Sequence, residues 1–353
     1  MEQAHFEHYR MGIRKLMSLM GQEHPRLSEI LVLQHRLMKN LQQTLADGPS
    51  EALYVSRLRI LESCNWLSQE VLDTSFYDLC DIDRPLTTST SDAEAVVRDR
   101  QQQHLLDEYF TEVKYLLEHK GLRTAEVTSQ ARDAARNATL EILRCLQDNC
   151  VRKGQVVQFL YESGLITEGP GVIFLTDADL FGAYLENVSL IEAHLAGTDL
   201  RHAHLARAHL EWARLGETDL SEADLSRAHL AAAHFAGANL LNARLEGAEL
   251  IGANLAGANL VGAHLESAHL EWAFMVTANL EGAILRNAHL SGAEMMWARL
   301  PRADLSGADL TGANLEHAHL VWARLKGARY DARTRWPVGF DHVAAQALLV
   351  DVS

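Results

Sequence analysis

Large apolar residues recur at every fifth position from Leu180 to Tyr330. Alanine stands two residues before each of them except at Val188, Thr198 and Thr218. The 31 positions of this series hold leucine apart from Phe235, Met275, Met295 and Tyr330. A period of five fits neither the 3.6-residue repeat of a helix nor the two-residue repeat of a strand. The backbone must therefore turn once per unit, as in an array of short stacked repeats.

The repeating unit reads Ala-(Asp/Asn)-Leu-x-x, which is clearest over residues 305–315. Over residues 176–330 this pattern resembles that of the pentapeptide-repeat proteins. The resemblance implies a right-handed, square-sectioned parallel β-helix with four pentapeptides per coil, leucine in the bore and alanine at its corners. Stacking would bury a continuous apolar ladder. Its expected core includes Leu180, Leu200, Leu220, Leu240, Leu260, Leu280, Leu300 and Leu320.

The segment after the array, residues 328–341, is similar to the closing segments of such arrays. An open end of stacked strands would template further pairing, so a cap is physically required. Trp336 and Phe340 are the expected plug, within a C-terminal cap over 331–353.

Residues 1–80 predict about three amphipathic helices, since Ile13, Leu16, Met17 and Met20 follow helical spacing. This block resembles the effector-associated adaptor modules of bacterial conflict systems. Such modules couple protease, NTPase or signalling chains through like-with-like contacts. The alternative is a helical bundle that merely packs on the array.

Residues 81–92 are polar and rich in serine and threonine, which is typical of a linker. Three further helices are expected at about 93–120, 125–148 and 152–163. Together, residues 93–170 resemble a helical lead-in found before arrays of this kind, with the array itself over 171–330. The predicted fold class is α+β with segregated parts: N-terminal all-α domains followed by the parallel β-helix.

The formal net charge is −15, of which −9 falls in residues 171–353. An acidic balance argues against direct nucleic-acid binding through a basic surface. The longest apolar runs are far below the roughly 20 residues of a membrane span. The cysteines lie outside the array at spacings unlike those of a zinc site, and no secretory signal follows Met1, so a cytoplasmic bacterial protein is expected.

Two sets of outward side chains are candidate partner-binding residues. Exposed tryptophans often anchor protein partners, and the array places Trp212, Trp272, Trp297 and Trp322 in outward positions. Their alternative role is packing against the helical half or against arginine side chains. With four units per coil, residues twenty apart stack, so a carboxylate column forms from Asp179, Asp199 and Asp219. That column is either ordinary solvated surface or a strip that mimics DNA phosphates.

Nine of the eleven histidines in the array occupy the outward position just before the central leucine. Histidines one coil apart would lie about one strand spacing from each other, close enough to share a metal. Adjacent parallel ligands do not make a closed tetrahedral cage, however, so neither a metal site nor a cofactor is predicted. No phosphate loop or catalytic motif occurs, and the protein is expected not to be an enzyme.

The function that fits this organisation is a protein-interaction scaffold. It would be an adaptor linking an effector, such as a protease or signalling protein, to a partner in bacterial defence or regulation. A homodimer through the N-terminal helices would be the default closed assembly. One alternative is a DNA-mimicking modulator of type II topoisomerase of the quinolone-protection type. Another is the substrate of a protease partner, cut in the linker at 81–92.

Overall fold

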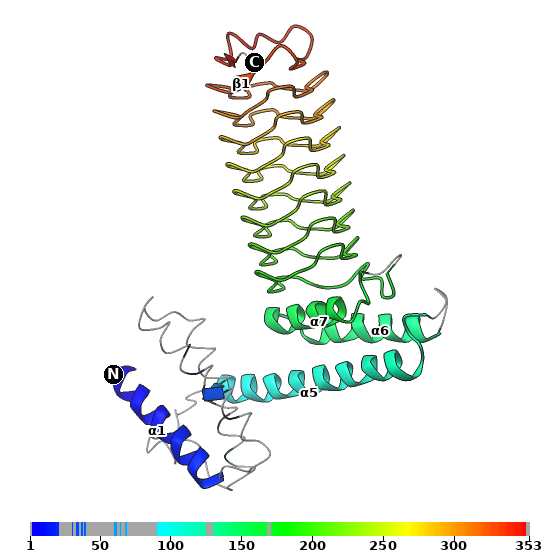
Figure 1. Ribbon diagram of the computed structural model, residues 1–353, viewed down its shortest axis with the longest axis vertical. Coiled ribbons are helices and arrows are strands. Elements are labelled where there is room, and N and C mark those ends of the chain that lie inside the picture. Colours follow the sequence, from blue (N-terminus) through cyan, green and yellow to red (C-terminus); the bar gives the residue numbers. More distant parts are fainter. Residues whose placement is uncertain are drawn as a thin grey trace. The chain divides into compact units, whose positions relative to one another are not determined.

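The computed structural model describes residues 2–20, scattered helical positions between 30 and 68, and residues 90–124, 130–167 and 171–350. The chain divides into two compact units, Met1–Val97 and Arg98–Ser353. Helices make up the described part of the first unit, and helices followed by a stacked repeat array make up the second (Figure 1). The prediction of N-terminal helices followed by a repeat array is confirmed.

In the first unit, helix α1 spans Glu2–Met20. Tyr9, Ile13 and Leu16 are buried, and their spacing of four and three residues places them on one face of the helix. Met17 is half-buried. Further buried positions along this unit are helical as well: Ile30, Leu37, Leu61 and Cys64. The number of helices predicted over 1–80 and most of the predicted linker lie outside the described residues.

The second unit begins within helix α5, which spans Thr90–His119. Helix α6 spans Gln130–Cys145 and helix α7 spans Cys150–Glu162. The start of α5 at Thr90 corrects the C-terminal end of the linker predicted over 81–92. The physical reason is that serine, threonine and aspartate favour helix starts as well as loops.

Polar and aromatic contacts tie the three helices together. The Tyr109 hydroxyl on α5 lies 2.9 Å from the Thr139 hydroxyl on α6. Burial raises the pKa of this tyrosine, so the phenol stays protonated. The ring centroids of Phe110 on α5 and Phe159 on α7 lie 4.6 Å apart. These contacts join the three helices to one another, and their buried residues belong to the same apolar cluster as the bore of the array.

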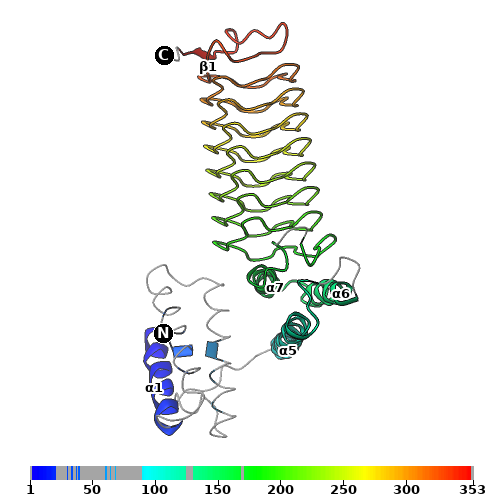
Figure 2. The same ribbon diagram turned by 45° about the vertical axis from the view of Figure 1, so that its right-hand side comes forward.

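Helix α7 covers the first coil of the array, as Figures 1 and 2 show. The backbone amide of Tyr184 donates to the carbonyl of Cys150 at 2.9 Å. A Cβ at Gly154 would overlap the carbonyl oxygen of Tyr184 and lie 3.1 Å from its carbonyl carbon. The helix and the coil therefore approach closely only because position 154 has no side chain. This helix therefore covers the edge of the first coil, which would otherwise be open to further strand pairing.

The array is built from coils of twenty residues. Parallel bridges join each outward residue to the one twenty positions later, from Asp179↔Asp199 through Asp309↔Arg329. At each corner a four-residue turn closes, as where the Ala203 amide donates to the Leu200 carbonyl at 3.1 Å. The third turn residue has positive φ, 56° at His202, as a type II turn requires. Each side of the square is so short that it forms one isolated bridge, so regular strands are few.

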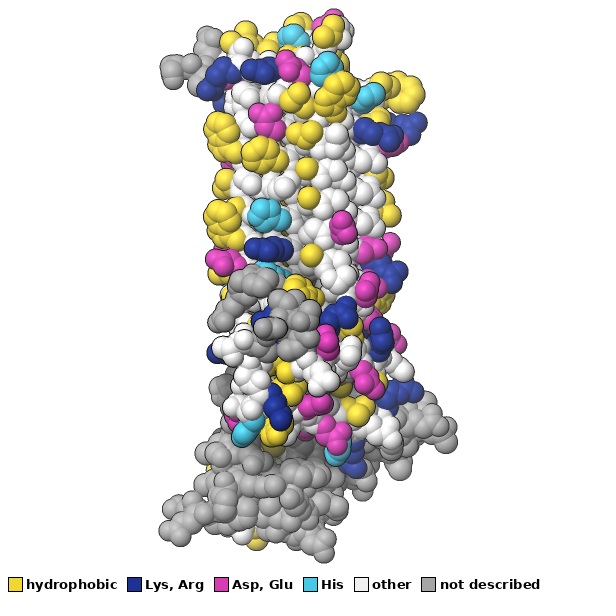
Figure 3. All heavy atoms as spheres, turned by 90° about the vertical axis from the view of Figure 1, so that its right-hand side faces the viewer, with side chains coloured by type: hydrophobic (Ala, Val, Ile, Leu, Met, Phe, Trp, Pro, Cys, Tyr) yellow, Lys and Arg dark blue, Asp and Glu magenta, His cyan; other side chains and the backbone are white. Residues whose placement is uncertain are grey.

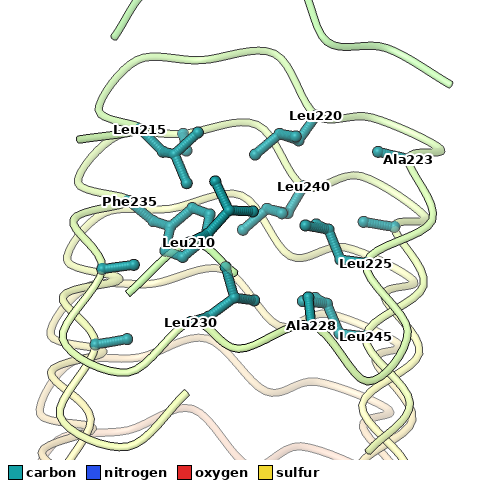
Figure 4. Packing of buried hydrophobic residues seen from close by; sticks show 14 of the residues in the cluster. Leu210, Leu215, Leu220, Ala223, Leu225, Ala228, Leu230, Phe235, Leu240 and Leu245 are labelled. Atoms are coloured by element: carbon teal, nitrogen blue, oxygen red, sulfur yellow. The ribbon is translucent and has the colours of Figure 1, made fainter. Parts of the chain in front are cut away.

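The bore of the array is apolar and closed. Figure 4 shows leucine side chains and Phe235 directed inward from the surrounding sides. The eight leucines predicted as core residues are at most 7% exposed, the highest value being that of Leu320. Two threonines, Thr198 and Thr218, stand in place of corner alanines. Neither buried hydroxyl is left unpaired, because both donate to the Leu195 carbonyl, at 2.8 and 2.9 Å.

At the C-terminal end the twenty-residue register breaks. Strand β1, Arg329–Tyr330, pairs in parallel with β2, Leu348–Leu349, and Asn314 bridges Arg335, twenty-one residues later. The extra residue falls in a tight turn that starts at Asp331.

The Asp331 carboxylate holds that turn in place. It accepts hydrogen bonds from the amides of Gly312, Arg333 and Thr334. Burial alone would raise the pKa of Asp331, but these bonds outweigh it and lower the pKa to about 2. Beyond the turn, Trp336 and Phe340 stack with centroids 5.5 Å apart and pack on the end of the core.

Candidate protein-binding surface

The four tryptophans of the array all occupy corners. Their φ angles are 59–61°, the left-handed conformation that every corner imposes on its third turn residue. Non-glycine residues pay roughly 1–2 kcal/mol for this conformation. Every one of the four is more than half exposed: Trp212, Trp272, Trp297 and Trp322. Neither backbone preference nor burial therefore accounts for an indole at these corners.

Three of the indoles lie flat against the neighbouring coil. Trp297 stacks on the ring of His317 with centroids 4.1 Å apart and planes at 12°. The Arg302 guanidinium lies over the Trp322 ring, 5.2 Å from its centroid. Ring atoms of Trp272 occupy the space that a Cβ at Gly292 would need. One face of each ring is supported by the array, and much of the side chain remains open to solvent.

The tryptophans do not share one side of the array. Trp212 and Trp272 lie on the same corner, sixty residues and therefore three coils apart, about 14 Å at one strand spacing per coil. Trp297 lies on the next corner and Trp322 on the one after that, because each further five residues advance the chain by one corner. Trp272 and Trp297 therefore flank one side on neighbouring coils, and Trp297 and Trp322 flank the next side in the same way.

The side between the corners of Trp272 and Trp297 carries several exposed or half-exposed apolar side chains. Phe274 projects from its centre and is 53% exposed. Val276 and Met296 lie on adjacent coils at its far corner, joined through the hydrogen bond from the Thr277 amide to the Met296 carbonyl. We call the five residues the tryptophan patch: Trp272, Phe274, Val276, Met296 and Trp297. Glu294 stands beside Phe274 on the next coil of the same side, and its carboxylate accepts from the Asn314 side-chain amide at 2.9 Å.

Phe274 was not among the residues that the sequence singled out. Its signal was present, since it holds an outward position that polar residues or histidine occupy in most other units. A large apolar residue in that position, two residues after a corner tryptophan, marks the patch.

The predicted carboxylate column forms, and each of its members has an intramolecular partner. Asp179 pairs with the buried Lys153 of α7 at 2.8 Å. Asp199 receives two hydrogen bonds from the Arg201 guanidinium, at 2.8 and 2.7 Å, which lower its pKa. Asp219 accepts from the Ser221 hydroxyl and begins an amide ladder with Asn239. All three carboxylates are therefore engaged in ion pairs or hydrogen bonds within the protein.

Charges of both signs are spread over the array. Figure 3 shows one face, on which acidic, basic and histidine side chains are interspersed among small residues. Arg244 lies 3.5 Å from Asp224 and Arg286 lies 2.8 Å from Asp304, each pair joining neighbouring coils. This face is not a continuous acidic surface.

Among the described residues, three groups bring together side chains that could ligate a metal. Their ligand atoms lie within 4.8 Å of one another: His209, Glu211 and His229; His269, Glu271 and His289; and Glu246, His264 and Glu266. Two of the three have the same composition and the same place in the repeat.

No helix in the described part of the chain combines the length and the apolarity that a bilayer crossing requires.

Comparison with known proteins identifies the family to which the array is similar. Residues 178–327 match the family model of pentapeptide repeats in overlapping segments: 178–216, 203–233, 228–266, 263–300 and 297–327. No curated protein sequence matches the chain.

Three solved structures illustrate the similarity. HetL, a pentapeptide repeat protein involved in heterocyst differentiation regulation in Nostoc sp. PCC 7120, is 35% identical over 49% of this chain and 89% of its own, with a TM-score of 0.35. The protein alr5209 of Nostoc PCC 7120 is 35% identical over 30% of this chain and 84% of its own, with a TM-score of 0.20. QnrB1, a plasmid-mediated fluoroquinolone resistance protein, is 20% identical over 43% of this chain and 83% of its own, with a TM-score of 0.25.

Proposed function

The repeat array of this chain belongs to the pentapeptide repeat family, and from that membership we propose that the protein is a non-enzymatic interaction scaffold. Its array presents the tryptophan patch to a protein partner. The observation that carries this proposal is the patch itself: two supported indoles and a phenylalanine, exposed together on one side of a rigid stack of coils.

The patch has the physical properties of a binding anchor. Interface hot spots are enriched in tryptophan, and a polar rim usually surrounds them. The indoles of Trp272 and Trp297 rest on Gly292 and His317, so binding would order little that is not ordered already. Low ordering cost leaves more of the contact energy for affinity. The expected partner surface is a concave apolar site that accepts flat aromatic rings.

Replacing both Trp272 and Trp297 with alanine tests this surface. Hot-spot truncations cost about 2 kcal/mol or more, so affinity for the partner should fall at least roughly thirty-fold. The measurement is a titration of purified full-length protein against a partner captured by the wild-type chain. Stability should change little, because both side chains are mostly exposed.

Trp212→Ala is the matched control. Trp212 occupies the same corner as Trp272 within the same local sequence, His-Leu-Glu-Trp-Ala, but Arg214 stands where the patch has Phe274. This variant should bind the partner as the wild type does. Equal binding by the double variant, or an equal loss in the Trp212 variant, would remove the patch from the proposal.

We propose further that residues 1–80 give the scaffold its adaptor role in a bacterial defence or regulatory system, in the cytoplasm. These helices would recruit an effector, such as a protease or signalling protein, or a second copy of the chain. Two observations support this role. The first unit is compact in its own right, and α7 already covers the first coil of the array, so the first unit is not needed to close that end. Since the cap covers the other end, self-association is expected to run through the first unit.

Light scattering on the full-length chain and on a chain that begins at Thr90 tests this role. The full-length protein should have the mass of a dimer and the shortened chain that of a monomer. A shortened chain that keeps the dimer mass would assign assembly to the array and take the main support from the adaptor role.

The alternative functions are less well supported. A DNA mimic needs a continuous strip of free carboxylates, whereas Asp179, Asp199 and Asp219 are engaged by Lys153, Arg201 and Ser221. For a protease substrate, most of the expected cleavage segment at 81–92 lies outside the described residues.

A further inference from the structure

We propose that the array holds two equivalent sites for a divalent transition-metal cation, each made of two histidines and one glutamate. One site consists of His269, Glu271 and His289, and the other of His209, Glu211 and His229. The proposal is independent of the protein-binding function and departs from the sequence prediction, which considered the histidine column alone.

The backbone brings the three ligands of each site together. His269 and His289 form a parallel bridge, so their Cα atoms are held one coil apart. Their rings lie face to face, with centroids 4.4 Å apart and planes at 4°. Glu271 follows two residues after His269, and its Oε1 lies 3.2 Å from the Nδ1 of His269 and 4.0 Å from that of His289. One carboxylate oxygen therefore faces both imidazoles.

The second site repeats this geometry. The rings of His209 and His229 stack with centroids 4.4 Å apart and planes at 2°, and Glu211 Oε1 lies 3.4 Å from His209 Nδ1. One difference is an additional contact from His229 Nδ1 to Glu249 Oε2 at 2.9 Å. Glu249 stands between the two sites in the same column and adds a further carboxylate near the second one.

The glutamates supply an observation that ordinary surface ion pairing does not explain. Oε2 of Glu211 and Oε2 of Glu271 are buried and have no hydrogen-bond partner. A buried carboxylate oxygen without a donor is costly. A cation bound at Oε1 would offset the charge of the whole group.

Two imidazoles and one carboxylate suit the later first-row divalent cations, such as Zn²⁺ and Ni²⁺. Binding requires each ring to tilt from the stacked arrangement, so that both lone pairs point at one ion about 2.0–2.1 Å away. The side chains of His269 and His289 are 41% and 48% exposed, which leaves them room to tilt. Three protein ligands would leave coordination positions for water or for a ligand from a partner.

Equilibrium dialysis against Zn²⁺, with the bound metal measured by elemental analysis, tests the proposal on tag-free full-length protein. The wild type is compared with His269→Asn/Glu271→Gln, with His209→Asn/Glu211→Gln and with the fourfold variant. Each pair of substitutions should remove one equivalent of Zn²⁺, and the fourfold variant should lose two. Other groups, such as Glu246, His264 and Glu266, contribute equally to all samples, so only the difference is used.

His234→Asn is the matched control, since His234 is an exposed histidine in the same outward position of the repeat but belongs to no ligand group. It should bind as much Zn²⁺ as the wild type. Histidine ring nitrogen signals of the wild-type protein give a second measurement that needs no variant: those of His269 and His289 should shift on addition of Zn²⁺. Unchanged stoichiometry in the fourfold variant, an equal loss in the His234 variant, or unmoved ring signals would overturn the proposal.

Discussion

Leu255→Lys should abolish cooperative folding of the array. Leu255 is 1% exposed in the middle of the bore. Truncating a buried leucine costs about 2–5 kcal/mol, and an unpaired buried ammonium adds several more. The sum is comparable with the whole stability of a typical domain, about 5–15 kcal/mol. Circular dichroism should show loss of the wild-type melting transition, and limited proteolysis should cut near the substituted coil, because each coil is stabilised only by its neighbours.

Leu255→Met is the control for this experiment. The same position in the next two coils is held by Met275 and Met295, both at most 1% exposed. A volume-conserving exchange of this kind costs less than about 1.5 kcal/mol. The methionine variant should therefore melt as one unit near the wild-type temperature. A lysine variant that did the same would contradict the buried ladder.

Gly154→Ala should destabilise the contact between α7 and the first coil, although local preference predicts the opposite. Alanine in a helix interior is favoured over glycine by about 0.8–1.0 kcal/mol. Here the added methyl would meet the carbonyl oxygen of Tyr184, which is backbone and cannot turn aside. Overpacking of this kind costs about 1–3 kcal/mol. Denaturant unfolding should show a lower stability, and hydrogen exchange should be faster at the Tyr184 amide, which donates to Cys150.

The neighbouring substitution Gln155→Ala separates the two effects. Gln155 is exposed on the same helix, so its replacement changes helix propensity with no contact at stake. It should leave stability within about 0.5 kcal/mol of the wild type. A Gly154 variant as stable as the wild type, or more so, would show that α7 does not approach the first coil as closely as described.

The sequence by itself determined the array. A five-residue period admits no regular helix or strand, and leucine paired with alanine two residues earlier leaves only a backbone that turns at each unit. The Thr198 and Thr218 exceptions could not be interpreted from the pattern. Their hydroxyls are satisfied by a Leu195 carbonyl that stacking brings within reach.

The sequence predicted only part of which outward side chains lie next to each other on the array. Residues twenty apart could be aligned once four units per coil were assumed, which placed the aspartate and histidine columns. Neighbours on adjacent columns could not be aligned in this way. Their side chains come together only through the turn at each corner, which the repeat spacing does not describe. The contact of Glu271 with His289, 4.0 Å apart, belongs to this class.

The closing segment was predicted from the sequence, but the hydrogen bonds that close the ends of the array and the pairing of its charges were decided by the tertiary structure. Lys153 lies on a helix twenty-six residues before Asp179, and no periodicity relates the two positions. The single-residue break at Asp331 depends on hydrogen bonds to a coil formed nineteen residues earlier. A short repeat specifies its own backbone through local turns and nearest-neighbour stacking, whereas its caps and ion pairs depend on contacts between segments that share no pattern.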